Sequence, residues 1–270
     1  MTLPDLQKKP ELPPLFLPTK LWIYTNYNCN LRCSYCVAES HPGASKRIIQ
    51  LTTVKRIVDE AVELGFKNIY LTGGEPFILD DIYEMLAYAS AKLSTTVLTN
   101  AMLFNSTRLQ ELVAIKNERL ILQVSLDGSQ PEHHDPYRGQ GSWQKTVEGI
   151  HKLREAGFRI CLSTTETAAN TMFLDEICEF RRSLGIPDED HIIRPLAKRG
   201  FSDYGMEVGK HNLVPEMTIN TEGVYWHPLS TDPDLLVSEE IFPLLDSIVK
   251  IRVELAEVSI SPHAEREEFQ

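Results

Sequence analysis

The chain repeats one pattern of apolar and polar positions along most of its length, a short apolar run followed by a longer amphipathic segment. Runs rich in apolar and β-branched residues predict strands at residues 21–25, 68–71, 95–98, 120–126, 158–163 and 191–194. Apolar residues at helical spacing predict helices at 51–65, 80–92, 107–116, 142–156 and 171–184. Thr52 or Thr53 suits the N-cap of the first helix, and Gly65 suits its C-terminal end.

This alternation predicts an α/β protein with a parallel sheet, because right-handed crossovers place successive strands side by side. Eight such units would close a barrel, and six leave it open on one side. We therefore expect a partial (β/α)₆ TIM-like barrel, with the working groups at the C-terminal ends of the strands.

The repeat stops near residue 200, and the remaining sequence predicts a smaller unit. Residues 217–228 predict a hairpin with a Gly-containing turn, and residues 238–257 predict an amphipathic helix with Pro243 in an early turn. The expected organisation is a Pro-rich arm at 1–18, the barrel at 19–205, a hairpin-plus-helix cap at 206–262 and a charged tail at 263–270.

The composition and net charge of the chain disfavour some classes of function. The 270 residues are 42% hydrophobic and 24% charged, as in ordinary globular proteins, and carry a formal net charge of −11 with a pI near 5.2. This balance disfavours a general binder of nucleic acids or anionic membranes, which needs a basic face. The first residues show neither the basic nor the apolar region typical of a signal peptide, and no apolar run reaches membrane-spanning length, so we expect a cytoplasmic protein with reduced thiols.

Three cysteines on one loop after the first strand carry the strongest chemical signal. Cys29, Cys33 and Cys36 form a Cys-x-x-x-Cys-x-x-Cys motif with Tyr35 directly before the third cysteine. A [4Fe-4S] cluster has four irons, so three thiolates would leave one iron open to another ligand. A Cys₃His zinc site that includes His41 is the main alternative, although zinc ligands more often come from two separated pairs.

The motif resembles the defining motif of the radical S-adenosylmethionine (SAM) enzymes, whose shared architecture is a partial (β/α)₆ barrel. The resemblance implies one [4Fe-4S] cluster held by the three cysteines and SAM bound at the open iron. It also implies an external electron donor such as a flavodoxin or ferredoxin, and reductive cleavage of SAM to a 5′-deoxyadenosyl radical.

The second strand ends in Gly73-Gly74-Glu75-Pro76, which resembles the Gly-Gly-Glu-Pro segment that receives the SAM methionine amino group in this family. Glycines allow close approach of the backbone to a ligand, and Glu75 offers carboxylate oxygens.

Later strand ends complete the expected SAM site. Asn100 belongs to a Thr-Asn pair that resembles the family's Thr-Asn-Gly, with Ala101 in place of the glycine. Ser125 and Asp127 resemble the family's Ser-x-Asp-Gly, and alternation along a strand puts both on one face. Arg138 closes a His-Asp-x-x-Arg-Gly stretch and suits the SAM carboxylate, with a surface loop arginine as the alternative.

Glu166, Arg194 and Arg199 follow the last two barrel strands and are candidate catalytic or substrate-side groups. Cys161 and Cys178 lie among apolar residues, so we expect buried small side chains rather than cluster ligands.

The 134–139 stretch and the hairpin resemble the SPASM and twitch branch of peptide-modifying enzymes, although the cysteines for auxiliary clusters are missing. We therefore expect a ribosomally made peptide as substrate, brought by a separate leader-recognition protein or bound directly by the barrel. His227 is the unusual ligand-capable residue of the hairpin, although a lone histidine is more often structural. The alternatives are a radical SAM enzyme acting on a small metabolite or nucleotide, and a non-enzymatic iron-sulfur electron carrier or zinc-stabilised scaffold.

Overall fold

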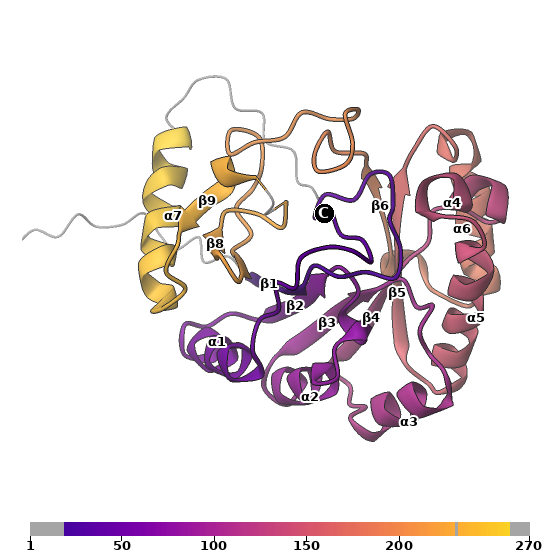
Figure 1. Cartoon of the computed structure of the whole chain (residues 1–270), viewed down its shortest axis with the longest axis horizontal. Coiled ribbons are helices and arrows are strands. Elements are labelled where there is room, and N and C mark those ends of the chain that lie inside the picture. The colour runs from indigo at the N-terminus through magenta and orange to yellow at the C-terminus, as the bar shows by residue number, and fades with distance from the viewer. Residues whose placement is uncertain (1–18, 230–231, 260–270) are drawn as a thin grey trace, which may run out of the picture.

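The computed structural model of the chain describes residues 19–229 and 232–259, and its core is one curved sheet of nine strands in the order β6-β5-β4-β3-β2-β1-β7-β8-β9 (Figure 1). The first six strands are all parallel and are β1 (Lys20–Asn26), β2 (Asn68–Gly73), β3 (Ser94–Thr99), β4 (Leu120–Ser125), β5 (Arg159–Glu166) and β6 (His191–Pro195). The predicted open (β/α)₆ barrel is therefore confirmed.

The helices that connect these strands lie along the outer side of the sheet (Figure 1). They are α1 (Leu51–Glu63), α2 (Ile82–Lys92), α3 (Ser106–Ala114), α4 (Pro131–Arg138), α5 (Ser142–Glu155) and α6 (Leu174–Ser183). Single 3₁₀ turns occur at Pro76–Ile78, Thr171–Phe173, Asp188–Asp190 and Pro233–Leu235.

Alternation along each strand separates the helix-facing core from the interior of the barrel. In β1, Leu21 and Ile23 are fully buried in the main apolar core, whereas Trp22 and Tyr24 line a pocket on the opposite face. The same alternation recurs in β4 and β5, where Ser125 and Ser163 face the pocket.

The C-terminal strands extend the barrel sheet. Strand β7 (Thr218–Asn220) pairs in parallel with β1 and forms the predicted hairpin with β8 (Gly223–Tyr225). Strand β9 (Leu236–Ser238) then pairs with β8, and helix α7 (Leu244–Ser259) packs beside it. The predicted helix start at Ser238 is therefore wrong, because this segment pairs as a strand and the helix begins only after Pro243.

Three other local predictions differ from the structure. Helix α4 was not predicted, and its last residue, Arg138, is buried rather than on a surface loop. Gln50 precedes α1 without a side-chain cap, so neither threonine caps that helix. Cys161 and Cys178 are half-buried rather than buried.

The predicted N-terminal arm and charged tail lie outside the described residues. None of the helices in the described part of the chain combines the length and the apolar character needed to cross a bilayer.

Candidate functional site

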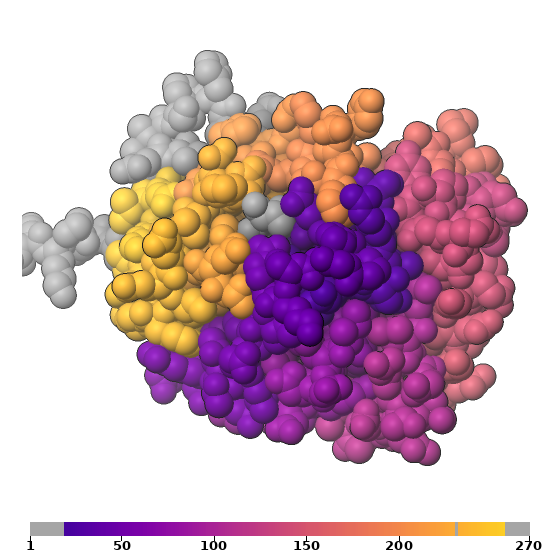
Figure 2. All heavy atoms as spheres, in the orientation of Figure 1, coloured from indigo at the N-terminus to yellow at the C-terminus, as the bar shows by residue number. Residues whose placement is uncertain are grey.

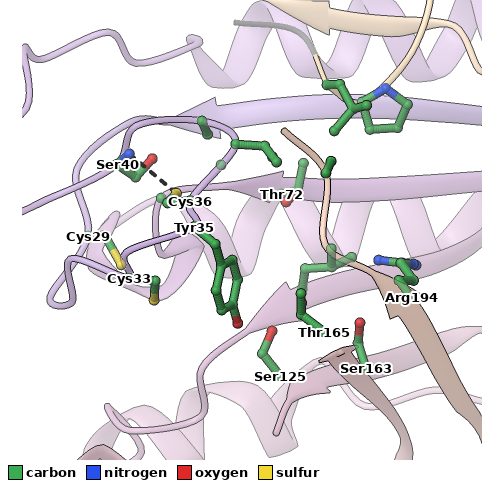
Figure 3. Close-up of a pocket in the computed structure, with 18 of the residues that line it drawn as sticks. Cys29, Cys33, Tyr35, Cys36, Ser40, Thr72, Ser125, Ser163, Thr165 and Arg194 are labelled. Atoms are coloured by element: carbon green, nitrogen blue, oxygen red, sulfur yellow. Dashed lines mark hydrogen bonds between the residues drawn. The ribbon is translucent and has the colours of Figure 1, made fainter. Parts of the chain in front are cut away.

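A pocket of about 250 Å³ opens at the C-terminal ends of the barrel strands (Figure 3). Its lining includes the predicted site residues Cys29, Cys33, Tyr35, Cys36, Gly73, Gly74, Asn100, Ser125, Arg138 and Arg194. The other predicted site residues, Glu75, Pro76, Asp127, Glu166 and Arg199, lie outside this lining. The barrel thus gathers groups from all six parallel strands or the loops that follow them into one cavity.

The three cysteines lie together at one end of the pocket (Figure 3). The backbone N–H of Leu31 donates to Cys29 Sγ at 3.4 Å, and that of Ser40 donates to Cys36 Sγ at 3.4 Å. The Asn100 side-chain amide approaches Cys29 Sγ at 3.9 Å. N–H donors aimed at sulfur are the hydrogen bonds that tune cysteine ligands of iron-sulfur clusters.

His41 does not take part in a zinc-like group with these thiols. Its Nδ1 accepts the backbone N–H of Gly43 at 3.1 Å, and its ring lies beside Phe201. Across residues 19–229 and 232–259, no set of three or more His, Cys, Asp or Glu side chains is arranged to hold a single metal ion.

Burial governs the protonation of the cysteines. It raises the pKa of Cys29 to about 12 and that of Cys33 to about 11, while the charge of Arg138 acts in the opposite direction on Cys33. Without a bound cation these two thiols are protonated at neutral pH. A metal centre that binds them must displace their protons, which couples its binding to pH.

Two close backbone contacts fix the cysteine loop. Glu75 N donates to Asn28 O at 2.9 Å, and a Cβ at Gly74 would lie 2.1 Å from the same oxygen. On the other side, Phe201 N donates to Cys36 O at 3.2 Å, and a Cβ at Gly200 would lie 2.2 Å from that oxygen. In Figure 2 the indigo loop accordingly lies at the surface against the orange segment that follows β6.

Gly74→Ala is expected to lower both the stability of the protein and its iron content after reconstitution. The added methyl group must push Asn28 and the adjoining Cys29 away, and overpacking of this kind costs about 1–3 kcal/mol. Thermal unfolding and iron analysis measure the two effects. Gly43→Ala is the matched control, since a Cβ there meets nothing closer than 3.4 Å. Equal behaviour of the two variants would contradict the close-contact argument.

Glu75 is an internal anchor in this structure rather than a group offered to the pocket. Its side chain is buried, and Oε1 accepts the Thr99 hydroxyl at 2.8 Å and the Phe77 N–H at 3.2 Å. Oε2 accepts the Asn100 N–H at 2.8 Å. The carboxylate therefore ties the end of β2 to the end of β3. Burial raises its pKa to about 7 despite these hydrogen bonds.

Glu75 should make stability depend on pH. Between about pH 4.5 and 7 the folded protein retains a proton that the unfolded chain has released, so folding weakens as the pH rises through this range. The contribution is on the order of 3 kcal/mol. Chemical unfolding at several pH values should show wild type losing stability relative to Glu75→Gln as the pH rises.

The exposed Glu63 supplies the control for this measurement. Glu63→Gln makes the same chemical change at an exposed helix position and so measures the effect of the substitution itself. A pH-independent difference between wild type and Glu75→Gln would contradict the raised pKa.

Asp127 forms the centre of a buried polar network just behind the pocket wall. Its Oδ2 accepts Arg138 Nε at 2.6 Å and the Tyr35 hydroxyl at 2.5 Å. Its Oδ1 accepts the Thr165 N–H at 2.9 Å and Arg138 Nη2 at 3.3 Å. Burial acts to raise the pKa of Asp127, but the charge and hydrogen bonds of Arg138, together with His134 and the Tyr35 hydroxyl, lower it overall.

The expectation that Asp127 and Arg138 both serve a ligand stays a prediction, and in this structure the two side chains contact each other. Four donors occupy the Asp127 oxygens, and the Arg138 guanidinium is paired with this carboxylate while it lines the pocket. Both groups fix the relative positions of the cysteine loop and the end of β4.

The rest of the 134–139 stretch supports the same network. His134 Nδ1 accepts the backbone N–H of Asp127 at 3.1 Å, and burial lowers the pKa of His134 to about 4, which keeps it a neutral acceptor. The Asp135 carboxylate accepts the N–H groups of Gly141 at 2.6 Å and Trp143 at 2.9 Å and thereby fixes the start of α5.

Of the three candidate substrate-side residues, one lines the pocket and two lie outside its lining. Arg194 lines the pocket from the end of β6. Glu166 instead accepts the Thr171 hydroxyl in an exposed region, and Arg199 forms an ion pair with Asp232 and donates to the Val208 carbonyl.

Several lining residues were not singled out in the sequence. They are Trp22, Tyr24, Thr72, Ser163, Thr165 and Glu216. The signal for four of them was available, because Tyr24, Thr72, Ser163 and Thr165 occupy inward positions near the C-terminal ends of predicted strands. Trp22 shares the inward face of β1 with Tyr24 but lies near the start of the strand. Glu216 had no comparable signal, since its place depends on the pairing of β7 with β1. Ala101, which takes the place of the glycine in the Thr-Asn-Gly resemblance, adopts a left-handed backbone with φ 58°.

Comparison with known proteins agrees with this geometry. The sequence profile of the Radical SAM superfamily matches residues 23–180. The chain is 31% identical to the AdoMet-dependent heme synthase of Methanosarcina barkeri over 58% of this chain and 45% of that protein. It is 32% identical to GTP 3′,8-cyclase 1 of Mycobacterium tuberculosis over 58% and 46%. It is 29% identical to the antilisterial bacteriocin subtilosin biosynthesis protein AlbA of Bacillus subtilis over 63% and 38%.

The chain thus spans less than half the length of these curated relatives. Among solved structures, the anSMEcpe enzyme with bound AdoMet aligns with a TM-score of 0.69 and 13% identity over 91% of this chain and 85% of that one. SuiB of Streptococcus suis bound to its precursor peptide SuiA aligns with a TM-score of 0.61 and 19% identity over 72% and 43%. At these identities the two structures support the fold alone.

Proposed function

Because this chain belongs to the radical SAM superfamily, whose enzymes use a [4Fe-4S] cluster and SAM, we propose that it modifies a peptide and holds the cluster through Cys29, Cys33 and Cys36. The observation that carries the cluster assignment is the convergence of these thiols on one end of the strand-end pocket. The donor set fits the group, since the loop supplies three thiols and two backbone N–H groups directed at sulfur.

When bound, the cluster and SAM supply the one-electron reductive cleavage that produces a 5′-deoxyadenosyl radical. The chain itself positions and shields the reactants. Gly73 and Gly74 let the end of β2 pack directly against the backbone of Asn26 and Asn28. Asn100 and Ser125 line the pocket with polar groups. Trp22 and Tyr24 line the pocket with buried aromatic rings.

The peptide substrate is supported by relatives rather than by a contact in this chain. AlbA is named as a bacteriocin biosynthesis protein, and mycofactocin maturase MftC is another relative at 31% identity. SuiB, which shares the fold, was solved with a precursor peptide. The open side of the barrel also suits an extended substrate. We further propose an external electron donor such as a flavodoxin or ferredoxin, and a separate leader-recognition protein or direct binding of the leader by the barrel.

The second candidate is a small-molecule radical SAM enzyme. The heme synthase and the GTP cyclase match this chain at 31% and 32% identity, close to the 29% and 31% of AlbA and MftC, and their names refer to small molecules. Under this candidate the substrate would be enclosed between the barrel and the segment from Glu216 to Leu229, which lines the pocket.

Anaerobic reconstitution with iron and sulfide, followed by SAM and a strong reductant, tests the proposal. We expect 5′-deoxyadenosine to accumulate, and to accumulate faster with a precursor peptide encoded beside the gene. A mass change in that peptide would identify it as the substrate. Stimulation by a tetrapyrrole or nucleotide, with no peptide binding, would favour the second candidate. A loaded cluster that neither binds nor cleaves SAM would overturn the enzymatic assignment.

A further inference from the structure

Ser40 lies at the cysteine end of the pocket, and its hydroxyl has no role in the site described above. The residue lines the pocket and is 2% exposed. Its backbone N–H donates to Cys36 Sγ at 3.4 Å, and Figure 3 shows the two residues beside each other. In the part of the chain that the structure describes, Ser40 Oγ has no hydrogen-bond partner. A buried hydroxyl without a hydrogen bond is costly, so this one calls for an acceptor.

The usual local acceptor for a serine hydroxyl is already occupied at this position. A serine side chain commonly bonds to the carbonyl four residues earlier, which here belongs to Cys36. Cys36 O accepts the N–H of Glu39 at 3.1 Å and the N–H of Phe201 at 3.2 Å. A carbonyl oxygen has two lone pairs, and these two donors use both of them. The Ser40 hydroxyl therefore needs a different acceptor.

The sulfur of Cys36 is the acceptor beside it. The Ser40 N–H already bonds to this sulfur, and in a serine only Cα and Cβ separate that nitrogen from the hydroxyl oxygen. Rotation about the Cα–Cβ bond moves the hydroxyl between staggered positions while the backbone stays in place. A neutral thiol is a weak acceptor, whereas a thiolate forms stronger, charge-assisted hydrogen bonds. The bond is therefore expected when Cys36 is a metal ligand, and not when it is a free thiol.

The surroundings of Cys36 favour such a bond. Tyr24, Tyr27 and Ala38 form a small buried apolar cluster, and Cys36 packs against it. These rings and the methyl group lower the local dielectric, which strengthens a hydrogen bond to a charged sulfur.

We propose that the Ser40 hydroxyl donates a hydrogen bond to the Cys36 thiolate when that thiolate is a cluster ligand, and thereby raises the reduction potential of the cluster. The inference rests on the proposed function, since it takes Cys36 as a ligand of the [4Fe-4S] group. Hydrogen bonds to ligand sulfurs stabilise the additional negative charge of the reduced state and so set the potential. Cys36 would then have two donors, as Cys29 has in the Leu31 N–H and the Asn100 amide. In this role Ser40 acts through Cys36 and is a positioning residue.

Redox titration of the anaerobically reconstituted protein without SAM, followed by electron paramagnetic resonance of the reduced cluster, tests this inference. We expect Ser40→Ala to shift the midpoint to a lower potential. At the wild-type midpoint, the ratio of reduced to oxidised cluster should fall about 3-fold or more. Ser40→Thr retains the hydroxyl and should stay closer to wild type than Ser40→Ala. Ser45→Ala makes the same change at an exposed serine that follows the cysteine motif, and should leave the potential unchanged.

A spectroscopic signature separates the hydrogen bond from a change in packing. Electron–nuclear double resonance in ordinary and deuterated buffer identifies the exchangeable protons that couple to the reduced cluster. One such coupling of wild type should be absent in Ser40→Ala and present in Ser45→Ala. Identical exchangeable couplings in wild type and Ser40→Ala, or an unchanged potential, would overturn the inference.

The cluster-free protein provides a check on folding. The Ser40 hydroxyl bonds to no group among the described residues, so Ser40→Ala should unfold at the same temperature as wild type before reconstitution. A destabilised cluster-free variant would mean that the hydroxyl serves the fold, which contradicts the proposed role.

The outcomes also separate this inference from the proposed function. SAM should bind equally well to wild type and Ser40→Ala. Weaker SAM binding with an unchanged potential would assign the hydroxyl to SAM and overturn the inference, while 5′-deoxyadenosine formation can still stand. A wild-type cluster that neither binds nor cleaves SAM would overturn the enzymatic function, and the potential measured without SAM would still decide the role of Ser40. Failure of wild type to assemble a cluster would overturn both.

Discussion

Cys33→Ala is expected to abolish 5′-deoxyadenosine formation and to lower the iron and sulfide content of the reconstituted protein. Alanine offers no ligand, so an iron that the thiolate would bind has no protein partner. Changes to residues that merely orient metal ligands cost about 10–100-fold in affinity or activity, and loss of a ligand should exceed about 100-fold. Product formation by chromatography, together with iron and sulfide analysis, measures the effect.

The other cysteines provide controls for this prediction. Cys29→Ala and Cys36→Ala should behave like Cys33→Ala, because all three thiols line the same end of the pocket. Cys161→Ala should retain iron, sulfide and activity, since Cys161 is half-buried in β5 and its thiol lies 3.3 Å from Asp190 Oδ1. Full activity in Cys33→Ala, or an equal loss in Cys161→Ala, would refute the cluster assignment.

Asp127→Ala is expected to cause the largest loss of stability of any single change at the site. Arg138 would be left as a buried charge without its carboxylate, and breaking a buried pair in this way costs about 3–5 kcal/mol. The Tyr35 hydroxyl and the Thr165 N–H would lose their acceptor as well. Denaturant unfolding of the reconstituted protein, compared with wild type, measures the change.

A double-mutant cycle separates the ion pair from general damage. Asp127→Leu combined with Arg138→Met should cost less than the sum of the two single changes, because the double variant buries no unpaired charge. Lys198→Ala removes an exposed partner of Glu207 and should leave unfolding unchanged. Additive single changes, or an Asp127→Ala variant as stable as wild type, would show that the pair is not the structural centre described above.

Tyr35 connects this stability prediction to the site. It lies directly before Cys36 in the cysteine loop, and its hydroxyl is hydrogen-bonded to Asp127. A variant that loses Asp127 should therefore also bind its cluster more weakly and retain less iron after reconstitution. The same buried network stabilises the fold and positions the proposed cluster ligands.

The glycines and cysteines of the site could be read from the sequence because their constraints are local. Cys29, Cys33 and Cys36 fall within one loop, and Gly74 lies directly after a predicted strand. The spacing of apolar residues that distinguishes strands from helices is likewise set over a few residues, which is why the six βα units and the open barrel were predicted correctly. The predicted secondary structure was wrong in short segments whose local sequence is compatible with more than one conformation, as in α4 and β9.

The roles of the charged side chains depended on contacts between distant segments. Glu75 and Asp127 both sit at strand ends where a ligand group was expected, yet neighbouring strands supply donors to their oxygens. The sequence shows which side chains carry hydrogen-bond acceptors, but only the packing of the strands shows which of those acceptors already have donors within the protein.

The sequence by itself determined the strand and helix periods, the loop with three cysteines and the family to which they point, because these features depend on neighbours in the chain. The tertiary structure alone decided that Arg138 faces Asp127, that Arg194 and His227 meet in one pocket, and that β7 docks on β1. Those pairings join segments up to about 200 residues apart, and their energies come from burial and electrostatic complementarity, which no local pattern records.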